Sequence, residues 1–360
     1  MINIDLPPVL KLCFQQAKPG GSILTLGRQT VGFGHEAIDG YLADGLFDVA
    51  AAERLRRAPL TQETVLEAMG FGAVHSLDVS DYEGCTHVFD LNRVDLPSAW
   101  RGAYSVVYDG GTLEHVFDFA TALRNCIELL EPLGLFVHIG PMNNWPDHGF
   151  YQFSPTLWFD VFVQNGFELL ASARIRLSQD AARGEFYAVD LLPPYEAASQ
   201  PRGPDRDVHV VVARKPAQAD SPWRTPSQSI YDVRHGRPTD RIEMATFHPF
   251  VVVGGRIAPR PARRSPIAPD RMVKAPGGAR RVEVRDLGFA GGTQRRPFRS
   301  PLVVMEDDAP LPFVACSPEA VAEGPPGRFC QRGWWMYFTA SDGSDPRANG
   351  RRYELRFPVD

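Results

Sequence analysis

Short apolar runs alternate with segments of helical periodicity over roughly the first 215 of the 360 residues. Most of the runs are bounded by glycine or end at a polar residue, which is typical of buried strands. The predicted strands are Ser22–Leu26, Ala73–Leu77, His87–Phe89, Tyr104–Tyr108, Leu135–Ile139, Phe167–Ile175 and Val208–Arg214, and the predicted helices are Ala50–Arg57, Gln62–Met69, Phe119–Leu130 and Ser154–Val163. Strands that alternate with helices predict an α/β domain with a doubly wound, mostly parallel sheet.

The pattern changes after Lys215. Residues 216–240 are rich in Pro, Ser and Gln, and we interpret them as a linker. From residue 241 to 360, short apolar runs are separated by Pro, Gly and Arg, and no helical periodicity is convincing. The predicted strands there are Phe250–Val253, Val282–Val284, Leu302–Met305, Trp334–Thr339 and Arg351–Phe357. We therefore expect a domain over residues 1–215, a linker, and a second, smaller all-β domain, a sandwich or barrel.

Polar residues follow the ends of several predicted strands of the first domain. They are the segment 27–29, Asp78, Asp90, Asp109 and the loop 141–148. In doubly wound sheets, ligands bind beyond the carboxyl ends of the strands. The sequence therefore predicts one ligand site at that edge of the sheet.

Composition narrows the class of protein. The chain is 44% apolar and 22% charged, close to the globular average, which argues against collagen, coiled coil and wholesale disorder. No apolar run approaches the ~20 residues of a membrane helix, and no signal-peptide pattern is present, so we expect a cytoplasmic protein. The five scattered cysteines form no CxxC pair, which favours reduced thiols over a disulfide framework or a zinc site.

The net charge of −5 conceals a basic stretch. Twelve Lys or Arg residues against three acidic residues give Arg256–Ser300 a local charge of +9. We interpret this stretch as a solvated, arginine-rich face; contact with an anionic polymer or with the acidic first domain is the alternative. Because no recognised nucleic-acid motif is present, we expect no nucleic-acid partner. We expect no membrane partner either, because no apolar run is long enough to span a membrane.

One stretch resembles a known family. Residues 104–141 read YSVVYDGGTLEHVFDFATALRNCIELLEPLGLFVHIGP, a strand, a small-residue turn into LEHV, a helix, a turn and a strand. This order is similar to that of the class I S-adenosylmethionine (SAM) dependent methyltransferases, and the predicted strands 167–175 and 208–214 fit the family's terminal antiparallel pair. The resemblance spans about residues 22–214 and implies a Rossmann-like fold, SAM as cofactor and methyl transfer.

The resemblance also implies which residues bind the cofactor. The turn after the first strand lies against the methionine moiety, Asp78 binds the ribose hydroxyls, and the end of the third strand meets the adenine. Asp109 and the two glycines after it line the methionine end. The implied cofactor-binding residues are Gly27, Arg28, Gln29, Asp78, Asp90, Leu91, Asp109, Gly110 and Gly111.

The sequence departs from the family pattern at three places. The first turn has fewer glycines than usual and places the large Arg28 where a small residue is common. The turn at 130–134 is one glycine short. About fifty residues separate Gly27 from Asp78, so residues 32–70 are expected to form a helical insertion and are a candidate lid.

Two histidines are candidates for the general base that a hydroxyl acceptor needs. His115 follows Glu114 beside the expected site, and His148 lies in the loop 143–151, where an acceptor would bind. In that loop Asn144, Trp145 and Tyr151 are the candidate substrate-binding residues. Each histidine also has a structural interpretation: His115 fixes its loop, and His148 is a surface residue.

A metal ion held by Glu114, His115 and Asp118 is conceivable, but these are few ligands, and we predict no metal. The aromatic run 334–338 is interpreted as a core strand, with a carbohydrate-binding face as the alternative.

We expect a SAM-dependent methyltransferase, an O-methyltransferase, that acts on a hydroxyl of a sugar or another small polar metabolite; its partner is a small-molecule or glycan acceptor. The alternative is a degenerate methyltransferase fold that serves as a non-catalytic binding or assembly protein in polysaccharide biosynthesis, which Arg28 and the sparse glycines favour. A nicotinamide-dependent oxidoreductase is disfavoured because no GxGxxG motif follows the first strand. Oligomeric state is left open.

Overall fold

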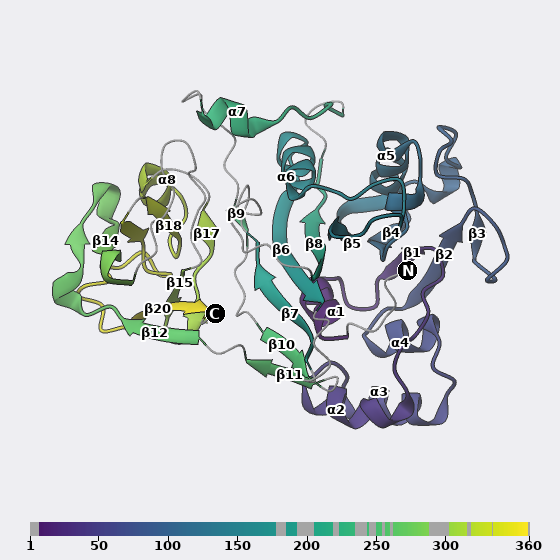
Figure 1. The fold of residues 1–360 in the computed structure, drawn as a ribbon, viewed down its shortest axis with the longest axis horizontal. Coiled ribbons are helices and arrows are strands. Elements are labelled where there is room, and N and C mark those ends of the chain that lie inside the picture. The colour runs from purple at the N-terminus through teal and green to yellow at the C-terminus, as the bar shows by residue number, and fades with distance from the viewer. Residues whose placement is uncertain are drawn as a thin grey trace.

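A computed structural model describes most of the chain. The described residues are 7–177, 185–192, 205–218, 223–234, 243–244, 250–253, 256–259, 262–287, 302–314, 318–332 and 334–358. Figure 1 shows two parts, a large α/β part and a smaller β-rich part that contains the C-terminal strands. No helix among these described segments has both the length and the apolar character needed to cross a membrane.

The α/β part is built on one ten-stranded sheet. Its strand order is β11-β10-β7-β6-β8-β5-β4-β1-β2-β3. The strands are β1 (Ser22–Leu26), β2 (Ala73–Asp78), β3 (His87–Val88), β4 (Tyr104–Asp109), β5 (Leu130–Asn143), β6 (Glu168–Leu177), β7 (Glu185–Leu191), β8 (Arg206–Arg214), β10 (Phe250–Val253) and β11 (Arg256–Pro259). The strands from β1 to β5 pair in parallel, whereas β8 lies antiparallel between β5 and β6.

Helices cover both faces of this sheet (Figure 1). They are α1 (Pro7–Phe14), α2 (Ile38–Ala43), α3 (Val49–Arg57) and α4 (Gln62–Ala68) on one face and α5 (Phe119–Leu129) and α6 (Pro155–Gln164) on the other. Successive side chains of a strand point to opposite faces of the sheet. Val106 therefore packs with α1–α4, and its neighbour Val107 packs with α5 and α6. The predicted doubly wound sheet is confirmed, but it is mixed rather than mostly parallel, because the pairings from β5 through β8, β6, β7 and β10 to β11 are all antiparallel.

Residues 32–70 hold three helices and pack into the core. Ile38, Ala52 and Leu66 from these helices are buried together with Val106 and other strand residues. At the start of α4, the side chain of Gln62 reaches the end of β1, where its Oε1 accepts hydrogen bonds from Gln29 N and Thr25 Oγ1. The segment therefore supplies one covering layer of the sheet.

The C-terminal part contains two smaller sheets. One has the order β12-β20-β15-β16 and the other β13-β14-β19-β18-β17-β9. The strands are β9 (Glu243–Met244), β12 (Ala262–Pro266), β13 (Val273–Lys274), β14 (Arg280–Glu283), β15 (Val303–Glu306), β16 (Ala309–Pro310), β17 (Phe313–Val314), β18 (Phe329–Arg332), β19 (Trp335–Phe338) and β20 (Tyr353–Pro358). Phe338 of one sheet and Tyr353 of the other are buried with ring centroids 5.2 Å apart, so the sheets share a core, which confirms the second, smaller β-rich part.

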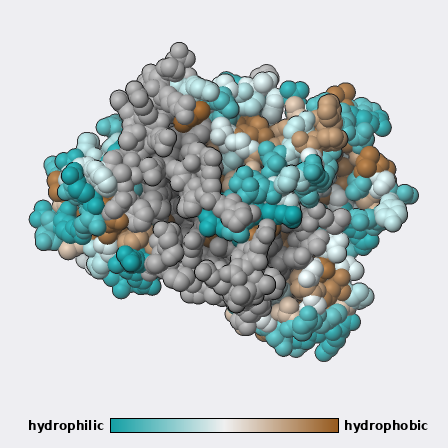
Figure 2. Space-filling model, viewed as in Figure 1, coloured by the Kyte–Doolittle hydropathy of each residue, from teal (hydrophilic) through white to brown (hydrophobic). Residues whose placement is uncertain are grey.

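The aromatic run beginning at Trp334 proves to be largely core. Met336 and Phe338 are fully buried, while Trp335 lies under the guanidinium of Arg281, 4.4 Å from it. In Figure 2 the surface over the C-terminal sheets is mostly hydrophilic, and apolar atoms gather at the opposite end, which carries α5 and β3.

Several elements differ from the expectation. β10 and β11, which the sequence analysis assigned to the C-terminal domain, pair with β7 and extend the large sheet. The structure also has α1, β7, a helix α7 (Ser229–Arg234) within the expected linker, and a helix α8 (Pro318–Glu323) in the C-terminal part. The region from 241 onward therefore contributes strands to both parts.

Candidate functional site

A cavity of about 470 Å³ opens at the carboxyl ends of β1, β2, β3 and β4. It is lined by Gly27, Arg28, Gln29, Leu77, Asp78, Val79, Glu83, Phe89, Asp90, Leu91, Asn92, Gly110, Gly111, Thr112, His115 and Val116. All the cofactor-binding residues expected from the sequence lie in this lining except Asp109. The structure thus brings residues from four separate strand ends to one cavity.

The turn after β1 requires glycine at position 27. Gly27 has a φ of +68°, a conformation that residues with a Cβ rarely adopt. A Cβ at this position would also lie 3.2 Å from Thr112 Oγ1 and 3.7 Å from an oxygen of Asp78. Glycine therefore keeps the backbone close to both neighbouring strand ends and open to the cavity.

The side chains of Arg28 and Gln29, which follow Gly27, are fixed by contacts with neighbouring residues of the protein. Gln29 is buried, and its amide nitrogen donates to the carbonyl of Leu26 at 3.0 Å. Arg28 forms a two-point ion pair with Glu63 on α4, with nitrogen–oxygen distances of 3.2 and 3.0 Å. The Glu63 carboxylate raises the pKa of Arg28 further. The large side chain at position 28 is thereby directed to α4 at the edge of the cavity.

Two carboxylates face the cavity from adjacent strand ends. Asp78 ends β2, and its Oδ1 accepts a hydrogen bond from Ser80 N at 3.1 Å. Asp90 lies after β3 and accepts hydrogen bonds from the backbone and side-chain nitrogens of Asn92 at 2.9 and 2.7 Å. These hydrogen bonds lower the pKa of Asp90. Both turns leave carboxylate oxygens available to hydroxyl or amine donors.

Asp109 is fully buried beneath the cavity. Its Oδ2 lies 2.6 Å from Nδ1 of the equally buried His138 on β5. Its Oδ1 accepts from the backbone nitrogens of Thr112 and Leu113, at 2.9 and 3.2 Å. Asp109 therefore fixes the turn that carries Gly110 and Gly111, and its own oxygens are used within the protein.

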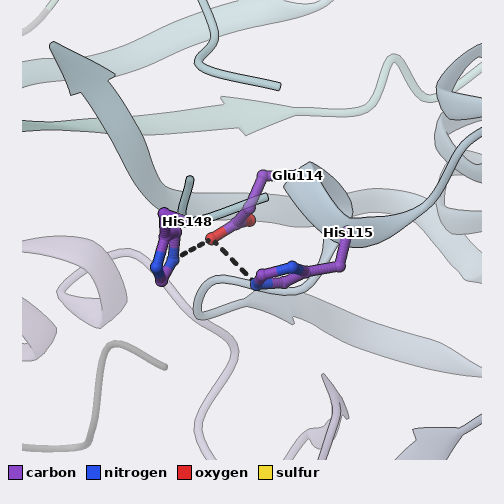
Figure 3. A group of neighbouring side chains, drawn as sticks. All are labelled: Glu114, His115 and His148. Atoms are coloured by element: carbon purple, nitrogen blue, oxygen red, sulfur yellow. Dashed lines mark ion pairs between the residues drawn. The ribbon is translucent and has the colours of Figure 1, made fainter. Parts of the chain in front are cut away.

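Beside the cavity, Glu114, His115 and His148 come together (Figure 3). Glu114 Oε1 lies 3.4 Å from Nε2 of His148 and 3.9 Å from Nε2 of His115. His148 is far from Glu114 and His115 in the sequence, but the backbone joins the two segments, since Phe150 N donates to the carbonyl of Glu114 at 2.9 Å. A Cβ at Gly149 would lie 2.9 Å from that same carbonyl, so glycine permits the close approach.

Burial shifts the pKa values of the three residues in this cluster. Loss of solvent, with the nearby charge of Asp109, raises the pKa of Glu114 to about 8. Partial burial lowers the pKa of His115 and that of His148 below the ordinary value of 6.5. Both imidazoles are therefore neutral at pH 7 and can accept a proton or bind a cation.

No protein-family model matches the chain, and no curated protein matches it in sequence. Among solved structures it is similar to a SAM-dependent methyltransferase from Mesorhizobium loti, with 16% identity, 59% of this chain and 98% of that chain covered, and a TM-score of 0.33. It is also similar to 1,6-didemethyltoxoflavin-N1-methyltransferase from Burkholderia thailandensis, with 15% identity, 59% and 78% coverage, and a TM-score of 0.33. A third similar structure is the [4+2]-cyclase SpnF, with 14% identity, 60% and 81% coverage, and a TM-score of 0.32.

The strand arrangement decides the fold. Parallel strands β1 to β5 are followed by the antiparallel pair β6 and β8, the pair that the sequence resemblance implies. The chain has the class I methyltransferase fold. On this fold the cavity lies beyond the carboxyl ends of the parallel strands, where doubly wound sheets bind their ligands.

The candidate acceptor residues lie outside the lining of this cavity. Asn144 donates to the carbonyl of Asp205 at 2.7 Å, and Trp145 Nε1 donates to that of Asp207 at 3.0 Å. Tyr151 donates its hydroxyl proton to the carbonyl of Phe117 at 2.7 Å. The three side chains hold the loop in place, although Trp145 also lies 4.9 Å from the His148 ring, centroid to centroid.

Sequence reasoning did not place Glu114 and His148 together. Of the metal ligands it considered, Asp118 instead caps α5, accepting hydrogen bonds from Thr121 N and Thr121 Oγ1. His138, which contacts Asp109 beneath the cavity, was also missed. A histidine in the middle of an apolar strand is the signal that would have drawn attention to it.

Proposed function

We propose that the cavity binds SAM and that the protein transfers its methyl group to a hydroxyl of a sugar or another small polar metabolite. The observation that carries the proposal is the meeting of Gly27, Asp78, Asp90 and the Gly110–Gly111 turn around one cavity, next to the neutral imidazole of His115.

The residues present fit this cofactor. Asp78 would bind the ribose hydroxyls, and Asp90 and Leu91 would contact the adenine. The backbone at Gly27–Gln29 and at Gly110–Gly111 would lie against the methionine part, because neither Gly27 nor the glycine pair places a Cβ in the way. Asp109 would act as a positioning residue, since its oxygens hold the turn rather than face the cavity.

SAM, when bound, supplies an activated methyl group with a good leaving group. The chain must therefore mainly align the acceptor and remove a proton from it. His115 lines the cavity, and its neutral ring can take that proton, as can His148 behind it. We propose one of these two histidines as the group that receives the proton of the acceptor hydroxyl.

A sugar or other polar ring as acceptor is supported by the aromatic surface beside the histidines. Phe117 is 71% exposed and Phe150 66% exposed, and their rings form an edge-to-face pair with centroids 5.7 Å apart. Aromatic faces pack against the apolar face of a sugar while its hydroxyls stay hydrated. Asn144, Trp145 and Tyr151 would hold the loop on which this surface is built.

Transfer of a labelled methyl group from SAM to a panel of free sugars, sugar nucleotides, phenols and amines tests the proposal. We expect incorporation into a hydroxyl compound, and a rate that falls at least tenfold in both His115→Ala and Phe150→Ala. His35→Ala, which changes an exposed histidine on another part of the surface, serves as the control. Incorporation into an amine alone would contradict the proposed acceptor class.

The alternative function, a non-catalytic binding or assembly protein, predicts a different result. The pairing of Arg28 with Glu63 is compatible with it because both side chains are already used within the protein. Such a protein would show no methyl transfer and no SAM binding. Binding of a glycan with no affinity for SAM would support this alternative.

A further inference from the structure

The carboxylate of Glu114 is an unusual feature of the site. Its side chain is fully buried, and neither oxygen has a hydrogen-bond partner among the described residues. The buried Nε2 of His148 likewise has no hydrogen-bond partner there. A buried carboxyl group without hydrogen bonds is costly whether it is charged or neutral, so natural proteins seldom keep one without a partner or a ligand.

The unsatisfied atoms point at one another. Figure 3 shows the Glu114 carboxylate directed toward the edges of both imidazoles. One ligand atom from each of Glu114, His115 and His148 lies within 4.8 Å of the others. This places two imidazole nitrogens and one carboxyl oxygen around a common point.

The spacing is close to that of a metal site. A tetrahedral ion with bonds of about 2.0–2.1 Å holds its ligand atoms about 3.4 Å apart. The distances from Glu114 Oε1 to the two histidine nitrogens are 3.4 and 3.9 Å. The three ligand atoms lie within 4.8 Å of one another, so the half-exposed His115 has to move closer when an ion binds.

We propose that Glu114, His115 and His148 form a binding site for a divalent metal ion such as zinc or iron(II). Two imidazoles and one carboxylate are the donors that these ions prefer, whereas Mg²⁺ and Ca²⁺ prefer oxygen ligands throughout. With three protein ligands, the ion keeps at least one open position, as catalytic rather than structural sites do.

The location of the ligands suggests what the ion does. His115 is both a ligand and part of the cavity wall, and the exposed Phe117 and Phe150 lie beside the cluster. The open position would take the acceptor's oxygen and lower its pKa. The hydroxyl proton then leaves to solvent, the oxygen forms the new bond to the methyl carbon, and the carbon–sulfur bond breaks with its electron pair on sulfur.

This last role rests on the proposed function, while the metal site itself does not. It also replaces the role of the histidines as proton acceptors, because their Nε2 atoms would bind the ion. Metal binding and SAM binding can therefore be measured separately, and either can fail alone.

Titration with Co²⁺ tests the site, because the visible absorption of this ion reports its ligands. We expect a band that saturates at one equivalent in the full-length protein. It should fall to background, or the Co²⁺ affinity should fall at least tenfold, in Glu114→Gln, His115→Ala and His148→Ala. His35→Ala and Asp118→Asn should leave the band unchanged.

His115→Ala is the decisive variant, since this side chain is 44% exposed and its removal leaves the core intact. Thermal unfolding and far-ultraviolet circular dichroism verify that each variant is folded. The absence of a saturable band, or a band that survives all three substitutions, would overturn the metal site. Co²⁺ binding without S-adenosylhomocysteine (SAH) binding would leave the metal site standing and contradict the proposed function instead.

Discussion

Two residues with left-handed backbone conformations lie in turns next to strands of the large sheet, Gly27 at the site and Leu133 at the opposite edge. Gly27 has a φ of +68° and Leu133, at the start of β5, a φ of +65°. The left-handed conformation costs roughly 1–2 kcal/mol for a residue with a Cβ. Gly27 avoids this cost, whereas Leu133 incurs it at the place where the methyltransferase family has a glycine. The two positions therefore respond to substitution in opposite directions.

Gly27→Ala should impair both stability and cofactor binding. The backbone strain should lower the free energy of unfolding by roughly 1–2 kcal/mol, and the new Cβ would crowd Thr112 at the cavity. We expect SAH affinity to fall about tenfold or more by calorimetry.

Gly20→Ala is the matched control, because Gly20 has a φ of +69° and a Cβ added there would meet no atom within 4 Å. It should lose similar stability and keep its SAH affinity. Equal SAH binding by the two variants would show that Gly27 does not face the cofactor.

Leu133→Gly should stabilise the protein. The Leu133 side chain is 58% exposed, so little packing is lost, and relief of strain exceeds the entropic cost of glycine by up to about 1 kcal/mol. Urea unfolding measures the difference, and Leu133→Ala, which keeps the Cβ, should show no gain. A loss of stability in Leu133→Gly would mean that the side chain makes contacts that matter.

At the residue scale, the sequence predicted the strand-end residues well and the histidine cluster poorly. Asp78 and Asp90 were found because a polar residue directly after an apolar run marks a strand end. The pairing of Glu114 with His148 depends on a backbone hydrogen bond between Phe150 and Glu114. No local pattern encodes that contact.

At the scale of elements, strong periodicity gave correct predictions. β1 was predicted with its observed limits, and α5 and α6 were predicted to within a residue or two, because their apolar residues recur at helical spacing. β7 was missed although its sequence, EFYAVDL, contains the short apolar run 186–189. The end of α5 was predicted from Pro132 and Gly134, which are helix-stop signals.

An ion pair ties β14 to the loop before β20, and it gives a pH prediction. Arg280 Nε donates to Asp345 Oδ1 at 2.7 Å, and the guanidinium lowers the pKa of Asp345 from 3.8 to about 2. A carboxyl with a lowered folded-state pKa stabilises the fold above pH 3.8 and loses this effect as the pH falls toward 2.

Asp345→Asn should therefore be less stable than the wild type at pH 6, by less than about 1 kcal/mol because the carboxylate is 40% exposed. The difference in urea midpoint should shrink between about pH 4 and about pH 2.5. Asp270→Asn, at an exposed aspartate of the same part, is the control. A difference independent of pH would show that the charge of Asp345 is not its source.

At the scale of the whole molecule, the two parts share chain segments. β9 belongs to a C-terminal sheet, while β10 and β11 close the edge of the large sheet. Strand pairing between distant segments is set by tertiary contacts, and apolar runs such as Phe250–Val253 do not reveal which sheet they join. In the described part of the basic stretch, Arg264, Arg271 and Arg280 form ion pairs with acidic residues of the C-terminal part.

Val251→Pro tests the place of β10. Proline removes a ladder hydrogen bond from a strand paired on both sides, where proline is essentially not found. We expect two thermal unfolding transitions, one for each part, and SAH should raise the melting temperature of the α/β part. Val251→Pro should lower the melting temperature of that same transition. Val304→Pro in β15 should affect the other transition. If Val251→Pro shifts only the transition that SAH leaves unchanged, β10 belongs with the C-terminal sheets.

Calorimetric titration with SAH tests the central claim, that the cavity at the strand ends binds SAM. We expect micromolar binding, about −8 kcal/mol, with a loss of roughly 1 kcal/mol or more in Asp78→Ala for a lost hydrogen bond. Asp81→Ala, on the same loop but outside the cavity lining, should bind as the wild type does. No binding at millimolar SAH, or equal binding by Asp78→Ala, would contradict the account.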